Sequence, residues 1–321
     1  MVKKDAAGTQ NETVAGVGSW MICSVAMMML NKKAISTFPY ECTLTAVQML
    51  FSVMVLLCSF RYIRFGSMRD VLRWSLVTPF FSGMLLTSML ALKHASMTLV
   101  VVFRCLSPIL ALPIEWLYLK TFQVNRSMLV AMLLMLLGTS LYASQLPRDN
   151  LPGIQWVFLN MLLAIGDRLL QRLMLAKEQN PVDISKAGVT LINNIVGFFV
   201  VTSIDAFQGG FAGSWNHLGE LSPEGMRCVV LSCVVSVGIS YTGVWAQSLI
   251  SATSFLMLVN ANKFIIIFME VFVMQTLMIN HLQLIGAILA VVSSVIYGHA
   301  RQELKEETLP ILTVGTDRKI P

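Results

Sequence analysis

Apolar residues run along most of this chain in stretches about as long as a membrane is thick. A helix needs about 20 residues to cross the hydrocarbon core of a bilayer. The sequence holds ten such stretches, joined by short polar segments and with no soluble domain attached. The pattern predicts ten membrane-spanning helices, at roughly 14–36, 40–60, 74–92, 95–119, 127–146, 151–170, 185–205, 228–249, 252–276 and 280–300.

The overall composition excludes a water-soluble class. Of the 321 residues, 56% are hydrophobic and only 12% are charged, whereas soluble domains carry about 25% charged residues. The polar first eighteen or so residues lack the pattern of a signal peptide, so we expect the first span to be retained. The six cysteines form no CxxC motif, so no disulfide framework, metal site or cofactor is expected. The sequence predicts an all-α polytopic membrane protein.

Basic residues gather in alternate loops. Most lysines and arginines of the loops and tails fall on one side of the predicted spans, and the opposite loops hold Lys93, Arg148 and Arg227. Cytoplasmic loops carry this excess of positive charge. Ten spans and this bias place both termini in the cytoplasm, and they explain the net charge of +6 without a nucleic acid partner.

Spans 4–5 resemble spans 9–10 at one fixed offset. Glu115 matches Glu270, and Tyr142 matches Tyr297. We predict two five-helix halves, 14–146 and 151–300, with cytoplasmic tails at 1–13 and 301–321. Because five is odd, the second half enters the membrane the other way up. Inverted repeats of this kind are typical of secondary transporters.

Charged and amide side chains lie on one face of span 9. Steps of three and seven residues bring Asn260, Lys263 and Glu270 together on a helix. In span 4, Arg104 and Glu115 share a face in the same way, and Pro108 and Pro113 should bend the helix. A charge at mid-membrane costs about 2.5–3.5 kcal/mol, so the pattern indicates either an anion site or ion pairs between helices.

Span 7 carries two adjacent asparagines, Asn193 and Asn194, in an apolar run. A carboxamide both donates and accepts hydrogen bonds, which suits the edge of a nucleobase such as guanine; bonds to neighbouring helices are the alternative. Gln48 either lines the same cavity or bonds a neighbouring helix. Lys32 is either a second phosphate contact or an interfacial anchor. The absence of a GxxxxGK[ST] motif argues against an ATP-driven pump.

These residues resemble the nucleotide-sugar transporters of the drug/metabolite transporter superfamily. The resemblance rests on Asn193-Asn194, on SATSFLMLVNANK in span 9, on LNKKAI closing span 1, and on ALKHASMTLVVVFRCLSPILALPIEW in spans 3–4. It is strongest for GDP-sugar carriers, including GDP-mannose transporters, which have FYNN in span 7 and GALNK in span 9. The match is partial: Leu191 and Ile192 replace Phe and Tyr, and Val259, Asn260 and Ala261 replace Gly, Ala and Leu.

The resemblance implies a fold, a site and a function. The fold is that of the drug/metabolite transporters, ten helices in a 5+5 inverted repeat. The paired asparagines would read guanine, and Asn262 and Lys263 would meet the phosphate and sugar. The full set of candidate binding residues is Asn193, Asn194, Asn260, Asn262, Lys263, Lys32, Arg104 and Gln48.

The expected activity is antiport in the Golgi membrane, not catalysis. A GDP-sugar, with GDP-mannose as the first candidate, would enter the lumen in exchange for GMP. The other expected partners are the lipid bilayer and a second copy of the chain in a homodimer. Three alternatives stay open: a UDP-sugar carrier, a sugar-phosphate translocator, and a proton-coupled metabolite exporter using Glu115 and Glu270.

Overall fold

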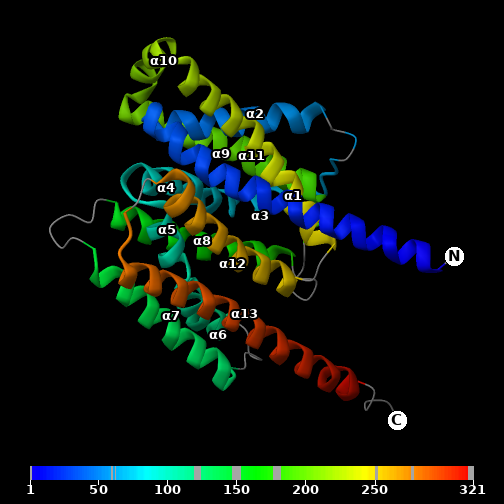
Figure 1. Cartoon of the computed structure of the whole chain (residues 1–321). Coiled ribbons are helices and arrows are strands. Elements are labelled where there is room, and N and C mark those ends of the chain that lie inside the picture. The colour runs from blue at the N-terminus through cyan, green and yellow to red at the C-terminus, as the bar shows by residue number, and fades with distance from the viewer. Residues whose placement is uncertain are drawn as a thin grey trace. The chain divides into compact units, whose positions relative to one another are not determined.

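The protein is helical throughout the part of the chain that the structure describes. In this computed structural model (Figure 1), those residues are 2–58, 61, 63–118, 124–146, 153–175, 182–249, 252–275 and 278–316, and no strand occurs among them. Helices lie within all ten predicted ranges. They are α1 (Val2–Thr37), α2 (Glu41–Cys58), α3 (Met68–Ser75), α4 (Thr78–His94), α5 (Met97–Arg104), α6 (Ser107–Tyr118), α7 (Arg126–Ser144), α8 (Ile154–Leu175), α9 (Lys186–Gln208), α10 (Gly210–Glu220), α11 (Pro223–Leu249), α12 (Ala252–Phe268), a π-helix η3 (Met269–Met274) and α13 (His281–Thr316).

The outer surfaces of the helices are apolar, as in proteins that lie in a bilayer. On α7, Leu129, Leu133 and Leu137 follow one another at four-residue steps and are 49%, 66% and 60% exposed. On α13, Leu282, Ile285 and others are exposed in the same way. A water-soluble monomer rarely exposes apolar patches this large, so these surfaces face lipid.

Seven helices of the described residues are long and apolar enough to cross a membrane. The predicted class, an all-helical multi-pass membrane protein, is confirmed, while the count of ten spans stays a prediction. The seven are Asn11–Thr37, Glu41–Cys58, Met68–His94, Arg126–Ser144, Ala187–Gln208, Pro223–Gly243 and His281–Arg301.

The chain divides into two compact units that interleave in sequence. One unit comprises Met1–Val100 and Asp149–Leu249, and the other comprises Val101–Arg148 and Ile250–Pro321. Each unit therefore draws on both predicted halves. The first takes spans 1–3 and 6–8, and the second takes the greater part of span 4 with spans 5, 9 and 10.

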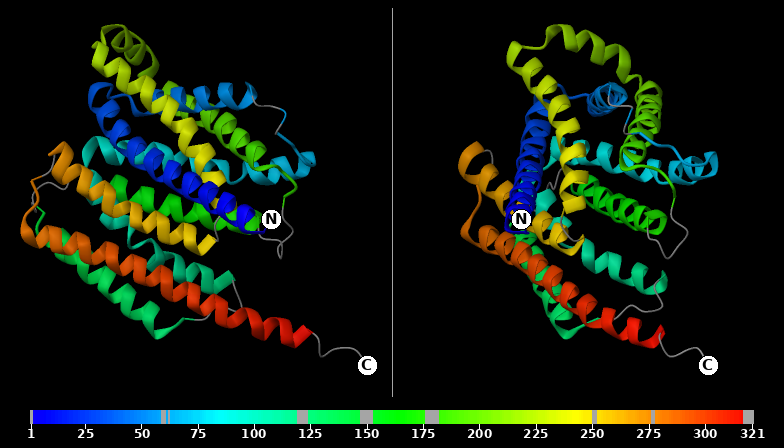
Figure 2. Two further views of the ribbon diagram at one scale, coloured as in Figure 1. Left: turned by 45° about the vertical axis from the view of Figure 1, so that its right-hand side comes forward. Right: turned by 90° about the vertical axis from the view of Figure 1, so that its right-hand side faces the viewer.

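The most extensive helix pairings inside the first unit are related by exchange of the predicted halves. Helix α1 packs along α11, α2 along α9 and α4 along α8, with further contacts of α2 with α11 and of α4 with α9 (Figure 2). If α8, α9 and α11 are the counterparts of α1, α2 and α4, exchanging the halves turns each of these contacts into another that is present. The predicted repeat of two halves would produce pairs of this kind, and the repeat itself stays a prediction.

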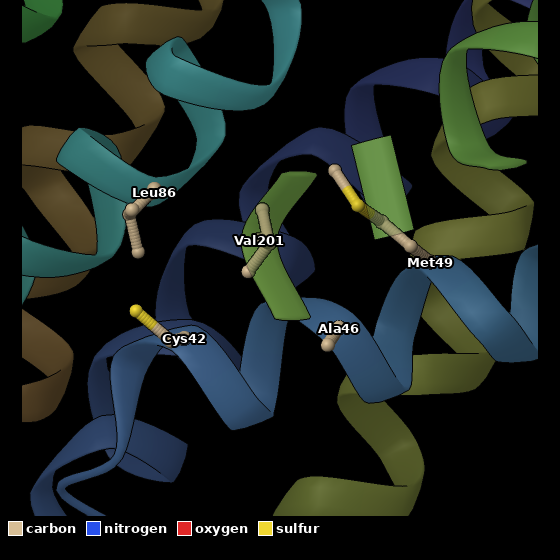
Figure 3. Close-up of a cluster of buried hydrophobic side chains, with 5 residues drawn as sticks. All are labelled: Cys42, Ala46, Met49, Leu86 and Val201. Carbon is tan, nitrogen blue, oxygen red and sulfur yellow. The ribbon is translucent and has the colours of Figure 1, made fainter. Parts of the chain in front are cut away.

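The core of the first unit lies where α2, α4 and α9 meet. Cys42, Ala46 and Met49 from α2 pack with Leu86 from α4 and Val201 from α9 (Figure 3). Small side chains on α2 allow the helices to approach closely, and Met49 fills the remaining space with its flexible chain.

The second unit contains an antiparallel pair of helices, α7 and α13. The start of α13 lies near the end of α7, because Asn280 Nδ2 donates to Gln145 Oε1 over 3.1 Å. At the opposite end, Met128 and Ala131 pack with Tyr297. Figure 1 shows the two helices side by side.

Span 4 is broken where proline predicts a bend. Helix α5 ends at Arg104 and α6 begins at Ser107, with Cys105 and Leu106 in a turn between them. Pro108 has no N–H to donate to the carbonyl of Arg104 and its ring would clash with that carbonyl in a continuous helix. The hydroxyl of Ser107 donates to this carbonyl instead, over 2.8 Å.

Candidate functional site

The paired asparagines lie buried within α9 of the first unit. Asn193 is 6% exposed and Asn194 is 5% exposed. The indole Nε1–H of Trp74 donates to Oδ1 of Asn193 over 2.9 Å. Asn194 Nδ2 donates to the carbonyl of Thr190, one turn back on α9, over 2.8 Å.

Local sequence determines where α9 begins and ends. The Ser185 side chain accepts from the backbone N–H of Gly188, which caps the first turn. The helix ends at Gly209, whose φ of 69° lies in the left-handed region that glycine adopts without strain. The asparagines therefore sit in the N-terminal half of a regular helix.

Trp74 anchors α3 against this part of α9. It is fully buried and packs with Val182, Ile184 and Ile192. Sequence reasoning missed this residue, because no spacing or motif links a single tryptophan to an asparagine 119 positions further along the chain.

Two other candidate residues of the first unit are engaged in helix packing. Lys32 Nζ donates to the carbonyls of Leu92 and Ala95, over 2.6 and 2.5 Å, at the C-terminal end of α4. A cation at a helix C-terminus is favourable because the last carbonyls carry partial negative charge. The contact favours an anchoring role for Lys32 over a phosphate contact.

Gln48 belongs to a buried polar network between helices. Its Nε2 donates to Asn31 Oδ1 over 3.0 Å and to the hydroxyl of Ser232 over 2.9 Å. The side chain thus joins α1, α2 and α11, which is the second of the two interpretations that its sequence context allowed.

The cationic candidates lie in the second unit, at the break in span 4. Lys263 Nζ is 3.6 Å from the sulfur of Cys105, the first residue of the turn between α5 and α6. Arg104 is the last residue of α5 and is half-buried. Neighbouring Asn262 is 3% exposed. The structure thus brings Lys263 to the interruption that Arg104 borders.

The remaining candidates of spans 4 and 9 are less fully described. The backbone of Asn260 belongs to α12, but its side chain lies outside the described residues, as does that of Glu115. Glu270 is 1% exposed and occupies the π-helix η3. Single-turn π-helical segments occur frequently at functional sites.

An arrangement of this kind can bind an anion. The break interrupts a helix within an apolar span, and in secondary transporters discontinuous helices of this kind line the substrate site. A lysine and an arginine beside the break add positive charge where low-dielectric surroundings strengthen its attraction for an anion.

Comparisons with known proteins agree with the class of protein that the fold defines, a multi-pass helical membrane protein. No family model matches the chain. The crystal structure of another protein matches it with a TM-score of 0.50 and 12% identity, over 90% of this chain and 97% of that one. This likeness concerns the fold alone.

A curated relative adds a more particular similarity. The chain is 23% identical over 279 residues to GDP-fucose transporter 1 of Arabidopsis thaliana. The aligned region covers 82% of this chain and 79% of the relative. The relative's name is that of a transporter, so the comparison points to a transporter and away from an enzyme.

Proposed function

We propose that this chain is a nucleotide-sugar transporter that exchanges a GDP-sugar for GMP. The single observation that carries the proposal is the similarity to GDP-fucose transporter 1, which extends over most of both chains. The resemblance of Asn193-Asn194 and Asn262-Lys263 to the FYNN and GALNK motifs of GDP-sugar carriers supports the same substrate class.

The cations at the span 4 break would bind the phosphates. Lys263 Nζ next to Cys105 places an ammonium group beside the turn between α5 and α6. Under the proposal, Lys263, Arg104 and Asn262 hold the diphosphate and the sugar, while Asn193 and Asn194 read the base. Asn260, which replaces an alanine of the motif, would offer its amide to the sugar hydroxyls.

The pairing of helices supports a transport mechanism based on two inverted halves. In the first unit, the most extensive helix contacts have counterparts under exchange of the halves. We propose ten spans arranged as a 5+5 repeat, with halves 14–146 and 151–300 and both tails in the cytoplasm. Such a repeat lets one site face alternate sides of the membrane, here the cytosol and the Golgi lumen.

The same residues explain why transport would be an exchange. The GDP-sugar and GMP share a base and a phosphate, so each stabilises the same closed state through the same contacts. In an empty carrier, the contacts of the anionic ligand with Lys263 would be missing, so the closed state would be less stable and the empty return would be disfavoured.

The sugar is the less constrained part of the proposal. GDP-mannose follows from the motif resemblance, and fucose appears in the name of the relative. Both are hexoses joined to the same nucleotide, so they differ only in the sugar. Uptake assays with both substrates would show which sugar the carrier prefers. UDP-sugars and sugar phosphates belong in the panel as the two remaining substrate classes.

Counterflow in proteoliposomes tests the proposal directly. Vesicles preloaded with GMP should accumulate a GDP-sugar rapidly, and vesicles that are empty or preloaded with AMP or CMP should not. Lys263→Ala should abolish exchange, since it removes the proposed phosphate ligand.

A second lysine provides the matched control. Lys33 is exposed on α1, so Lys33→Ala should leave exchange unchanged. Rapid uptake into vesicles without any nucleotide, or full activity of the Lys263 variant, would contradict the proposal. Exchange driven by a pH gradient and blocked by Glu270→Gln would instead indicate the proton-coupled exporter.

A further inference from the structure

We propose that α3 and the loop before it bind anionic phospholipids of the cytoplasmic leaflet. An apolar stripe of the helix would lie among the acyl chains, and arginines beside it would reach the headgroups. Such a surface goes beyond transport itself and does not depend on which nucleotide is carried. The length of the helix, the face that α3 leaves exposed and the charge beside that face all point to it.

The helix that leads into span 3 is longer than the core of a bilayer is thick. Met68–His94 comprises 27 residues, about 40 Å of helix, whereas the hydrocarbon core measures about 30 Å. Its first charged residues, Arg69, Asp70 and Arg73, all belong to α3. The stretch 76–92 carries no charge. The α3 end therefore extends out of the core to the level of the lipid headgroups, on the cytoplasmic side that the loop arginines predict.

One face of α3 is packed, and the opposite face is exposed and apolar. Trp74 is fully buried and faces α9. Met68, Leu72 and Leu76 follow one another at four-residue steps and are 73%, 63% and 70% exposed. At 3.6 residues per turn, Leu72 and Leu76 lie about 160° around the helix from Trp74. The stripe continues to Phe80 of α4, which is 37% exposed, so it joins the lipid-facing surface of the span.

Arginines lie beside this apolar stripe. Arg69 and Arg73 directly follow Met68 and Leu72 in the sequence, so both lie on the same side of the stripe. Arg69 is exposed, as is Arg61 in the loop before α3. An apolar face flanked by basic residues is typical of helices that lie in the membrane interface.

The acidic residues near this segment do not cancel its charge. Arg64 pairs with Asp183 over 3.1 Å, and Arg73 lies 3.6 Å from Asp70. The four arginines between 61 and 76 outnumber these two aspartates by two positive charges. The excess corresponds to the two exposed arginines, which therefore remain available to an anion.

Anionic lipid fits this surface better than a protein partner does. Anionic lipids of the cytoplasmic leaflet attract basic residues that lie next to a membrane span. The guanidinium group of arginine matches the geometry of a phosphate. Because the stripe is continuous with the lipid-facing surface at Phe80, acyl chains cover both together, whereas a protein partner would have to displace lipid from the span.

Photolabelling in proteoliposomes tests the proposal at the level of residues. The full chain is reconstituted with a trace of phosphatidylserine or phosphatidylcholine that carries a diazirine in its acyl chain, and mass spectrometry locates the label. Phosphatidylserine should label Met68–Leu76 at least about fivefold more than phosphatidylcholine does, the attraction expected of one arginine near a membrane surface. Exposed Leu133 and Leu137 of α7, in an uncharged stretch, should be labelled equally by the two lipids.

Two changes should remove the lipid preference. Combining Arg61→Gln with Arg69→Gln should bring the labelling ratio of α3 within about twofold of that of α7. Raising the salt from about 0.1 M to about 1 M should lower the ratio of the native chain, because the Debye length falls from about 10 Å to about 3 Å. The matched control is Arg227→Gln, exposed near the start of α11, which should leave the ratio unchanged.

The remaining outcomes would overturn the proposal. Equal labelling of α3 by both lipids would show that its arginines select no headgroup, and a preference that survives the double variant would place the selection elsewhere. Label on α7 but not on Leu72 or Leu76, with either lipid, would show that another protein surface covers α3. Because labelling needs no transport, failure of nucleotide exchange would overturn the proposed function and leave these outcomes unaffected.

Discussion

A polar residue inside an apolar helix either anchors a neighbouring helix or contributes to the candidate binding site. Only its contacts in the structure distinguish the two roles. Lys32 and Lys263 both follow an asparagine in an apolar segment. The first donates to the carbonyls at the end of α4, while the second lies beside the break between α5 and α6. A lysine that bonds the carbonyls of a helix end and a lysine beside a broken helix look the same in a sequence.

Replacing Lys32 tests its anchoring role. Lys32→Met should destabilise the protein by about 2 kcal/mol, because two hydrogen bonds from a charged group to buried carbonyls are lost. The KM for GMP should stay within twofold of the native value, about 0.4 kcal/mol. Thermal unfolding in detergent and counterflow measure the two effects, with exposed Lys33→Met as the control. A large rise in KM at unchanged stability would restore Lys32 to the binding site.

The sequence allowed part of the candidate site to be predicted at this scale. Asn193, Asn194 and Lys263 stand out because amides and charges are costly in an apolar segment. Trp74 does not, since a tryptophan is ordinary in such a segment. Its role depends on a partner that is distant in sequence and adjacent only after folding.

At the scale of helices, close approach depends on glycine. A Cβ at Gly138 of α7 would lie 2.6 Å from the backbone nitrogen of Ala290, and one at Gly286 of α13 would lie 2.6 Å from that of Tyr142. Backbone atoms cannot move aside as side chains can. In a bilayer, where lipid is as apolar as leucine, such small residues let helices pack tightly enough to associate.

Adding methyl groups at this contact should push α7 and α13 apart. Gly138→Ala and Gly286→Ala should each cost about 1–3 kcal/mol of stability, measured by thermal unfolding. The double variant should cost less than the sum, because one displacement of the helices relieves both clashes. Gly18→Ala, where a Cβ meets nothing within 4 Å, is the control. Fully additive effects would mean that the two glycines act separately.

Helix positions could be predicted better than helix partners. Runs of apolar residues marked the spans, and Pro108 marked the break in span 4, because both signals are local. Nothing local distinguishes α11 from α8 as the partner of α1, since their faces are similarly apolar. The π-helix Met269–Met274 also had no sequence signal.

At the scale of the whole chain, the matched tyrosines connect sequence to architecture. Tyr142 lies against Gly286 of α13, and Tyr297 packs with Ala131 of α7. Ala131 and Gly286 are themselves equivalent at the offset that matches Tyr142 with Tyr297. The contact of Tyr142 with Gly286 is therefore repeated at equivalent positions by the contact of Tyr297 with Ala131. A two-fold relation between the halves predicts such a pair of contacts.

The number of spans predicts on which side of the membrane the C-terminus lies. With the N-terminus in the cytoplasm, ten spans return the C-terminus to the cytoplasm, whereas the seven helices that meet the length and composition criteria alone would leave it in the lumen. Both counts place the segment between α10 and α11 in the lumen, since five of the seven, like seven of the ten, precede it. The C-terminus is thus the informative position.

Glycosylation acceptor sequences can read out these positions in cells. We expect an acceptor inserted between Leu221 and Ser222 to be glycosylated, and acceptors on flexible extensions of either terminus to stay unmodified. Glycosylation at the C-terminus as well as at the insertion, with the N-terminus unmodified, would reject ten spans, and with them the pairing of halves that alternating access requires. Glycosylation at both termini but not at the insertion would invert the orientation. That result would contradict the positive-inside reading of Arg61, Arg64, Arg69 and Arg73, while an even number of spans would still hold.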